Sequence, residues 1–314
     1  MEYLNSLSSN VIEINIVNKN LIILPDLSRF TCLQKLNCSH NQLTRLDNLP
    51  LSLQELNCSF NQITQLDNLP SSLLVVYCYY NQITQLDNLP LSLKILNCLS
   101  NQLIQLDNLP YSLQILKCSD NQLTQLDNLP SSLIELYCYK NSIMQLDNLP
   151  SSLQKIDCSY NQLTQLDNLP SSLIELYCYR NSIMQLDNLP LSLYKLNCTY
   201  NQLTQLNNLS YSLQILYCSN NQLTKLDNIP FSLHYLDCTN NKMKNNDLEY
   251  WKKQTKNKKL QILKEKMSAR KIQKIWRKYW YDFYKYEMID GKYIGFCRFI
   301  ERSYSIINGN FIKS

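Results

Sequence analysis

The sequence predicts a β-dominated protein of the α/β repeat class: a solenoid with a curved parallel β-sheet and an extended convex side, followed by a basic C-terminal helix. Three observations predict this fold. Eleven Asn and eleven Cys residues each recur with a period of 20. Apolar residues within each period alternate as they do in a strand. All ten Pro lie between Pro25 and Pro230, whereas all three Trp and all three Gly lie beyond residue 250.

One repeat reads LxxLxCxxNxLxxLDNLPxS, as in residues 53–72. Leu36 and Cys38 stand two apart and share one face of a strand, whereas Asn37 and Ser39 fall on the other. Each repeat therefore adds one short parallel strand, and stacked repeats share a core that a single repeat cannot form. The repeated Cys are Cys38, Cys58, Cys78, Cys98, Cys118, Cys138, Cys158, Cys178, Cys198, Cys218 and Cys238.

The repeated Asn follows each Cys by three positions, where the chain leaves the strand. We expect its amide to bond backbone groups of its own coil and of the next. The return segment LDNLPxS is too short for a helix of ordinary length, and its Pro favours extended backbone. A degenerate first repeat aligns through Ile16, Leu21, Leu24 and Leu27, with a step of 22 residues from Ile16 to Cys38.

These residues match the leucine-rich repeat signature LxxLxLxxN/CxL, with Cys in the third apolar position. The repeats resemble the short, LPX-containing leucine-rich repeats of bacterial secreted effectors and of proteins from giant viruses of amoebae. The resemblance covers about residues 11–245 and implies a binding surface on the concave face of the sheet. Some of those effectors carry a ubiquitin-ligase domain with a catalytic Cys after the repeats. Only about 70 residues follow here, with Cys297 alone, so that activity is not expected.

Four segments follow from these patterns. Residues 1–10 form an N-terminal flank, and residues 11–245 form a solenoid of about 12 repeats. Residues 246–286 form a basic amphipathic helix, and in residues 287–314 the pairs Asp290-Gly291 and Asn308-Gly309 predict a small hairpin.

The composition argues against an enzyme. With no Gly before Gly291, the repeats contain no GxGxxG or GxxxxGK[ST] phosphate loop and no GxSxG nucleophile elbow. The chain has two His, His40 and His234, which excludes a site built from several histidines. We therefore predict no catalytic residue, no cofactor and no resident metal.

The Cys and Asp columns each allow a metal-binding interpretation, but we favour a structural role for both. The repeated Cys lack the CxxC spacing of zinc sites, and the N-terminus lacks a secretion signal. We expect buried, reduced thiols and a cytoplasmic location, in the host cell if the protein is viral. One Asp also recurs per coil from Asp47 to Asp187. A turn role, with the carboxylate accepting backbone N–H groups, is favoured over a cation-binding stripe.

The side chains on the exposed strand face vary while the frame does not. Pairs of Tyr recur there, separated by small polar residues, and Tyr is enriched among interface anchors. The alternative is that these residues reflect sequence drift on a face that contacts only solvent. We predict a protein-binding surface on the concave face that comprises Tyr77, Tyr79, Tyr137, Tyr139, Tyr177, Tyr179, Tyr217 and Tyr235.

The tail is strongly basic. Residues 251–286 carry a net charge of +11, which leaves −6 for the rest of a chain whose total is +5. An apolar stripe with helical spacing runs from Ile272 to Phe283. Within it, Ile272, Gln273, Trp276 and Arg277 resemble the first half of the calmodulin-binding IQ motif IQxxxRGxxxR, but Lys278 replaces the Gly and Asp282 the second basic residue.

Three roles remain open for this helix. It caps the solenoid, binds calmodulin or another EF-hand protein through Ile272, Gln273, Trp276 and Arg277, or contacts an anionic membrane or nucleic acid. The last role is the least favoured, and no stretch of the chain is apolar enough to span a membrane.

Overall fold

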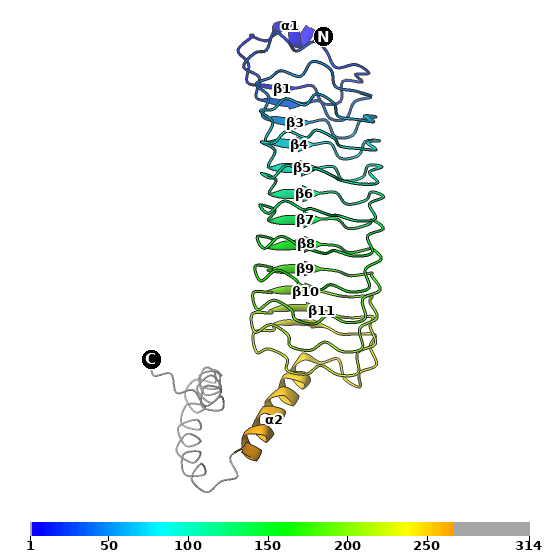
Figure 1. Cartoon of the computed structure of the whole chain (residues 1–314), viewed down its shortest axis with the longest axis vertical. Coiled ribbons are helices and arrows are strands. Elements are labelled where there is room, and N and C mark those ends of the chain that lie inside the picture. The colour runs from blue at the N-terminus through cyan, green and yellow to red at the C-terminus, as the bar shows by residue number, and fades with distance from the viewer. Residues whose placement is uncertain (1, 267–314) are drawn as a thin grey trace, which may run out of the picture. The chain divides into compact units, whose positions relative to one another are not determined.

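The computed structural model describes residues 2–266, with side chains from residue 4 to residue 259. The chain divides into two compact units, Met1–Lys252 and Lys253–Ser314. The first unit contains a sheet of twelve parallel strands in sequence order, which confirms the predicted solenoid (Figure 1).

Each strand is three residues long, and a helix lies near each end of the described chain. The elements are α1 (Glu2–Ser6), β1 (Glu13–Asn15), β2 (Lys35–Asn37), β3 (Glu55–Asn57), β4 (Val75–Tyr77), β5 (Ile95–Asn97), β6 (Ile115–Lys117), β7 (Glu135–Tyr137), β8 (Lys155–Asp157), β9 (Glu175–Tyr177), β10 (Lys195–Asn197), β11 (Ile215–Tyr217), β12 (Tyr235–Asp237) and α2 (Leu248–Lys266).

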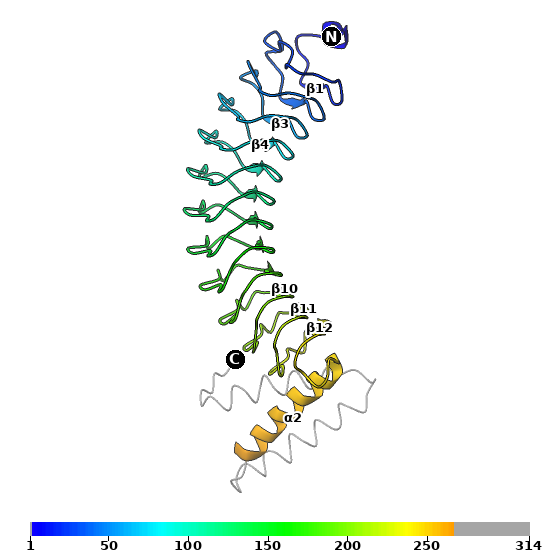
Figure 2. The same cartoon turned by 90° about the vertical axis from the view of Figure 1, so that its right-hand side faces the viewer.

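The strand register follows the repeat. From β2 onward each residue pairs with the one 20 positions later, as in Leu136 with Ile156. At the first junction Ile14 pairs with Leu36, which confirms the step of 22 residues for the degenerate repeat. Between Glu13 and Asp237 the return segments contain no helix, and the strands line the concave side of the first unit (Figure 2).

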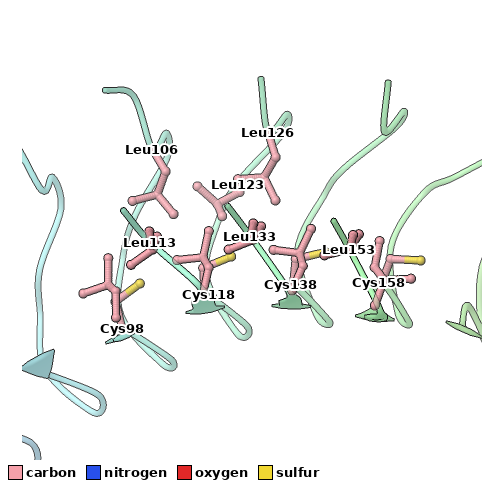
Figure 3. Close-up of a cluster of buried hydrophobic side chains, with 14 of the residues drawn as sticks. Cys98, Leu106, Leu113, Cys118, Leu123, Leu126, Leu133, Cys138, Leu153 and Cys158 are labelled. Atoms are coloured by element: carbon pink, nitrogen blue, oxygen red, sulfur yellow. The ribbon is translucent and has the colours of Figure 1, made fainter. Parts of the chain in front are cut away.

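Leu and Cys columns form the core (Figure 3). All eleven repeated Cys are buried and free, as predicted from their inward position. In several coils the thiol donates to a carbonyl of the following coil, as from Cys58 Sγ to the Tyr77 oxygen at 3.5 Å. Burial raises the pKa of these thiols, to about 12 for Cys38, Cys98 and Cys198. They pack as small apolar side chains and stay protonated.

The Asn ladder confirms the predicted bonds within each coil, but its bonds between coils go to the preceding coil and not to the next. Asn101 Nδ2 donates to its own coil at the Cys98 oxygen (3.0 Å) and to the preceding coil at the Cys78 oxygen (3.0 Å). Its Oδ1 accepts the Ile83 N–H of the preceding coil at 3.0 Å. The expectation of bonds to the next coil was wrong, because the turn after the strand directs the amide back toward the preceding coil. Each Asn thereby satisfies backbone groups that the buried turn leaves unpaired.

Each coil from β2 to β11 contains two residues with left-handed backbone, although no Gly is present in the repeats. One is the Asn of the return segment, such as Asn68 with φ of 52°. The other precedes the ladder Asn and includes large side chains such as Phe60 (53°), Tyr160 (51°) and Arg180 (53°). Asn tolerates this region, but bulky residues adopt it at a cost of about 1–2 kcal/mol. The geometry of the coil therefore imposes left-handed backbone on residues that do not favour it.

The start of α2 closes the end of the first unit. Asp247 caps the helix by accepting the Glu249 N–H at 3.0 Å. Trp251 is 8% exposed, belongs to the core and donates from Nε1 to the Asn245 oxygen at 2.9 Å. Ile272, Gln273, Trp276 and Arg277 of the IQ-like segment, Cys297 and the predicted hairpin of residues 287–314 lie outside the described residues.

Candidate functional site: the concave strand face

The eight predicted Tyr all lie on the strand face that points away from the core. Tyr77, Tyr137, Tyr177 and Tyr217 end strands β4, β7, β9 and β11. Tyr79, Tyr139 and Tyr179 lie two residues further on. These seven are half-buried, whereas Tyr235, at the start of β12, is 49% exposed. The structure brings Tyr137 and Tyr139 to within two coils of Tyr177 and Tyr179, and it places the Tyr217 and Tyr235 rings 4.9 Å apart.

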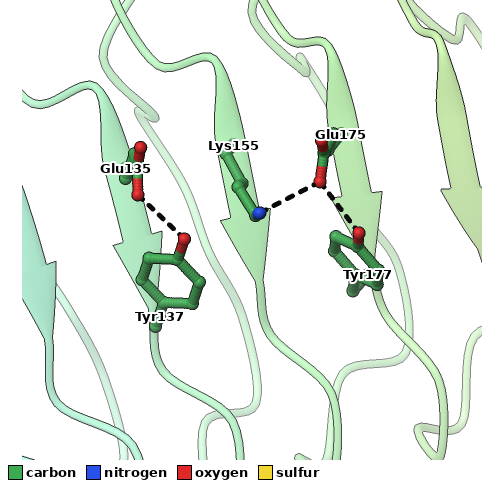
Figure 4. A network of polar contacts seen from close by, with 5 residues as sticks. All are labelled: Glu135, Tyr137, Lys155, Glu175 and Tyr177. Atoms are coloured by element: carbon green, nitrogen blue, oxygen red, sulfur yellow. Dashed lines mark hydrogen bonds and ion pairs between the residues drawn. The ribbon is translucent and has the colours of Figure 1, made fainter.

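A polar network fixes the Tyr side chains of β7 and β9 (Figure 4). The Tyr137 hydroxyl donates to Glu135 Oε2 at 2.8 Å, and the Tyr177 hydroxyl donates to Glu175 Oε2 at 2.8 Å. Lys155 of β8 forms a salt bridge with Glu175 at 3.1 Å. Burial and the neighbouring carboxylates raise the pKa of Tyr137 and Tyr177, so both hydroxyls remain donors at neutral pH.

Lysines lie over the same rings. Lys155 Nζ is 5.6 Å from the Tyr137 ring centre and 5.7 Å from that of Tyr177. Lys195 Nζ lies 5.0 Å from Tyr177 and 6.0 Å from Tyr217. Such cation–π contacts contribute roughly 0.5–1 kcal/mol each at partly exposed sites. The Tyr rings of β7, β9 and β11 are thus held in place before any partner binds.

A second column of side chains escaped the sequence analysis. It consists of the left-handed residue before each ladder Asn, and we call it the edge column: His40, Phe60, Tyr80, Ser100, Asp120, Lys140, Tyr160, Arg180, Tyr200, Asn220 and Asn240. The signal that reveals it is a large, variable residue at period 20 beside the constant Asn.

Rings of the edge column stack from coil to coil. Phe60 stacks on His40 at 4.2 Å and on Tyr80 at 4.7 Å between ring centres. Further along, the Arg180 guanidinium lies 5.0 Å from the Tyr160 ring and 4.8 Å from the Tyr200 ring. Tyr80 and Tyr200 are about half exposed, at 49% and 48%. The edge column therefore extends the aromatic surface of the concave face.

Among the described residues, no three His, Cys, Asp or Glu are arranged to hold a metal ion. A pocket lined by Asp147, Asn148, Leu149, Asp167 and Asn168 lies along the Asp column, away from the strand face. No described helix is both long and apolar enough to cross a membrane.

The fold and this face define a leucine-rich repeat protein built on a parallel β-solenoid. Comparison with solved structures supports this class. Residues covering 74% of the chain match YopM from Yersinia enterocolitica WA-314 with a TM-score of 0.66 and 34% identity, over 56% of that chain. YopM from Yersinia pestis, described as a leucine-rich effector protein, matches with a TM-score of 0.68 and 30% identity over 74% of this chain and 72% of that one. This chain belongs to the leucine-rich repeat family.

A third similar structure comes from Listeria monocytogenes. The functional domain of InlJ from Listeria monocytogenes, described as including a cysteine ladder, matches with a TM-score of 0.63 and 30% identity over 75% of this chain and 59% of that one. Neither the family models nor the curated proteins contain a match to the sequence.

Proposed function

We propose that the protein is a non-catalytic interaction module that binds a protein partner on its concave face. One observation carries the proposal: a hydrogen-bonded frame presents Tyr side chains that hydrogen bonds and cation–π contacts already hold in place. Rigid, half-buried Tyr lose little entropy on binding and are typical of interface anchors. Retention of bulky edge-column residues in left-handed backbone also favours a role for those side chains in binding.

Affinity capture tests this proposal. The full chain and a variant with Tyr77, Tyr137, Tyr177 and Tyr217 changed to Ala are used to isolate partners from host cells. We expect the variant to lose the partner that the unchanged chain retains. The matched control is the double variant Tyr111→Ala and Tyr211→Ala, because both Tyr are 71% exposed and lie outside the strand face. Equal capture by all three proteins would reject the concave-face assignment.

The alternative is an adaptor that recruits calmodulin or another EF-hand protein through Ile272, Gln273, Trp276 and Arg277. It rests on the sequence pattern of a basic amphipathic helix. A peptide of residues 266–286 titrated with calmodulin, with and without calcium, tests it, and absence of binding in both states rejects it. For either role we propose an intracellular location, with which the free thiols are compatible.

A further inference from the structure

Three planar side chains of the edge column stack on one another in the coils of β2, β3 and β4. The Phe60 ring lies 4.2 Å from the His40 ring and 4.7 Å from the Tyr80 ring, with interplanar angles of 15° and 14°. Because Phe60 covers one face of the Tyr80 ring, the other face points toward the following coil. Among the described residues, the ring contacts of Tyr80 are with Phe60 and Tyr79, and no cation lies over it. The stack therefore ends on the uncovered face of a ring that is 49% exposed.

The next residue of the edge column, Ser100, is too short to cover this face. Its hydroxyl donates to Asp120 Oδ2 of the following coil at 2.8 Å, so the side chain turns away from Tyr80. Ser100 has left-handed backbone with φ of 52°, the same value as Tyr80, so the column keeps its direction there. Ser100 and Asp120 are both partly exposed. A group from outside the protein can therefore reach the uncovered ring face.

The same column shows which group stacks at this position when the chain supplies it. Arg180 stands one coil beyond Tyr160, and its guanidinium lies 5.0 Å from the Tyr160 ring centre and 4.8 Å from that of Tyr200. Ser100 stands one coil beyond Tyr80 in the same way. Successive coils of a parallel sheet are about 4.8 Å apart. A guanidinium at the level of Ser100 would therefore lie at stacking distance from Tyr80.

A carboxylate lies next to this position. Asp120 belongs to the following coil, but its hydrogen bond with the Ser100 hydroxyl holds the carboxylate back toward the level of Ser100. Among the described residues Asp120 forms no salt bridge, although Lys140 follows it in the edge column. Burial raises the pKa of Tyr139, and the charges of Asp120 and Tyr80 raise it further, so these three groups lie near one another. An aromatic face beside a carboxylate is suited to a cation that also donates hydrogen bonds.

We propose that Tyr80 and Asp120 bind an arginine side chain of the protein partner at the level of Ser100. This inference rests on the proposed function and specifies the chemistry of the partner. The guanidinium stacks on the uncovered face of Tyr80, as Arg180 stacks on Tyr160, and donates to the Asp120 carboxylate. Arginine is favoured over lysine because its planar group stacks on the ring while its N–H groups remain available to the carboxylate.

The edge column itself supplies variants that change binding without disturbing the fold. Ser100→Arg places a guanidinium of the chain beside Tyr80, and Arg180 shows that this column position accommodates Arg with left-handed backbone. Asp120→Asn removes the carboxylate, and Asn220 occupies the same column position with φ of 54°. The matched control is Asn220→Arg in the coil of β11, because it changes the net charge of the chain by the same amount as either variant.

The test uses the full chain with ¹³C-labelled Tyr rings and N-acetyl-arginine-N-methylamide as the probe. Tyr80→Phe assigns the Tyr80 resonances, and we expect the probe to shift them saturably. Binding should be lost in Ser100→Arg, at least about five-fold weaker in Asp120→Asn and unchanged in Asn220→Arg. The neutral citrulline analogue should not bind, and the lysine analogue should bind more weakly. Equal binding of the lysine analogue, or an unchanged affinity in Ser100→Arg or Asp120→Asn, overturns the proposal.

The capture experiment separates this inference from the proposed function. Ser100→Arg should also weaken capture of the partner, and unchanged capture by this variant overturns the assignment of the site to the partner. If capture depends on the four Tyr of the strand face but the arginine probe does not bind, the interaction surface stands and the arginine site is rejected. If the probe binds and capture is indifferent to those four Tyr, the arginine site stands and the proposed use of the strand face is rejected.

Discussion

The concave face differs between strands β4–β6 and strands β7–β10. The first residues of β4, β5 and β6 are Val75, Ile95 and Ile115, so this part of the face is apolar in its first outward column. The first residues of β7–β10 alternate in charge, as Glu135, Lys155, Glu175 and Lys195. Behind both parts run the same buried Leu and Cys columns and the same Asn ladder. We call the repeated Leu, Cys and Asn columns the frame and the outward strand residues the face. Burial determines the frame, whereas the face can change from coil to coil without disturbing the frame.

The largest effect is expected when the pH is raised, because ionisation of the buried thiols destabilises the frame behind both parts of the face. An unfolded thiol titrates near pH 8.5, whereas burial raises the pKa of Cys98 to about 12. The thiol contribution to stability is therefore complete below about pH 8.5 and is lost as the pH rises toward the folded pKa. At about pH 9.5 each such thiol lowers the free energy of unfolding by about 1.4 kcal/mol.

Urea unfolding at several pH values measures this effect. Cys98→Val should flatten the pH dependence by the share of one thiol. The eleven repeated thiols should resist alkylation at neutral pH and react after unfolding, whereas the exposed Cys32 should react in the native protein. A free energy of unfolding that stays constant between pH 8 and pH 10 would contradict the assignment of buried, protonated thiols.

The next largest effect is expected when a substitution places a charge in the frame behind either part of the face. Cys138→Asp places an unpaired carboxylate where the thiol is now fully buried, and we expect destabilisation by about 4 kcal/mol or more. Cys98→Asp, behind the apolar part of the face, should have an effect of the same size because its surroundings are equally buried. Cys138→Val should be tolerated far better. Thermal or urea unfolding measures the loss of stability in each variant. A clearly smaller loss for one of the two Asp variants would show that the frame is not uniform.

Removing a ladder amide should have a smaller effect. Asn101→Ala deletes bonds to two coils and leaves buried carbonyls and the Ile83 N–H without a partner. We expect a loss of about 3 kcal/mol in the free energy of unfolding. The control is the adjacent exposed residue, where Gln102→Ala should change stability by less than about 0.5 kcal/mol. Similar losses in the two variants would show that the ladder does not support the fold.

The smallest effect distinguishes the two parts of the face. Glu175→Gln breaks the salt bridge with Lys155, which should reduce stability by less than about 1 kcal/mol and by less still in high salt. Ile95→Thr, on the apolar part, should show no such salt dependence. Unfolding in low and high salt compares the two variants, and an identical salt response would refute the distinction.

Much of the candidate site could be predicted from residues that recur at the same position in each repeat. The Tyr at positions 77, 137, 177 and 217 were identified by alternation, since a residue beside an inward Cys must point outward. The edge column was not recognised, because alternation ends with the strand and says nothing about a left-handed residue beyond it. The direction of the Asn bonds was also mistaken, because a repeat pattern is the same for the preceding and the following coil.

The sequence by itself determined the frame: its period, its parallel strands and its inward Cys and Leu, since burial at fixed spacing admits few arrangements. Only the tertiary structure decided which variable side chains meet. Tyr160, Arg180 and Tyr200 stack because left-handed backbone aligns them across three coils. Lys155 and Asp157 lie in the same strand, but Lys155 forms its salt bridge with Glu175 of the next strand. Such contacts depend on distances between coils and on competing partners, which are properties of the folded chain.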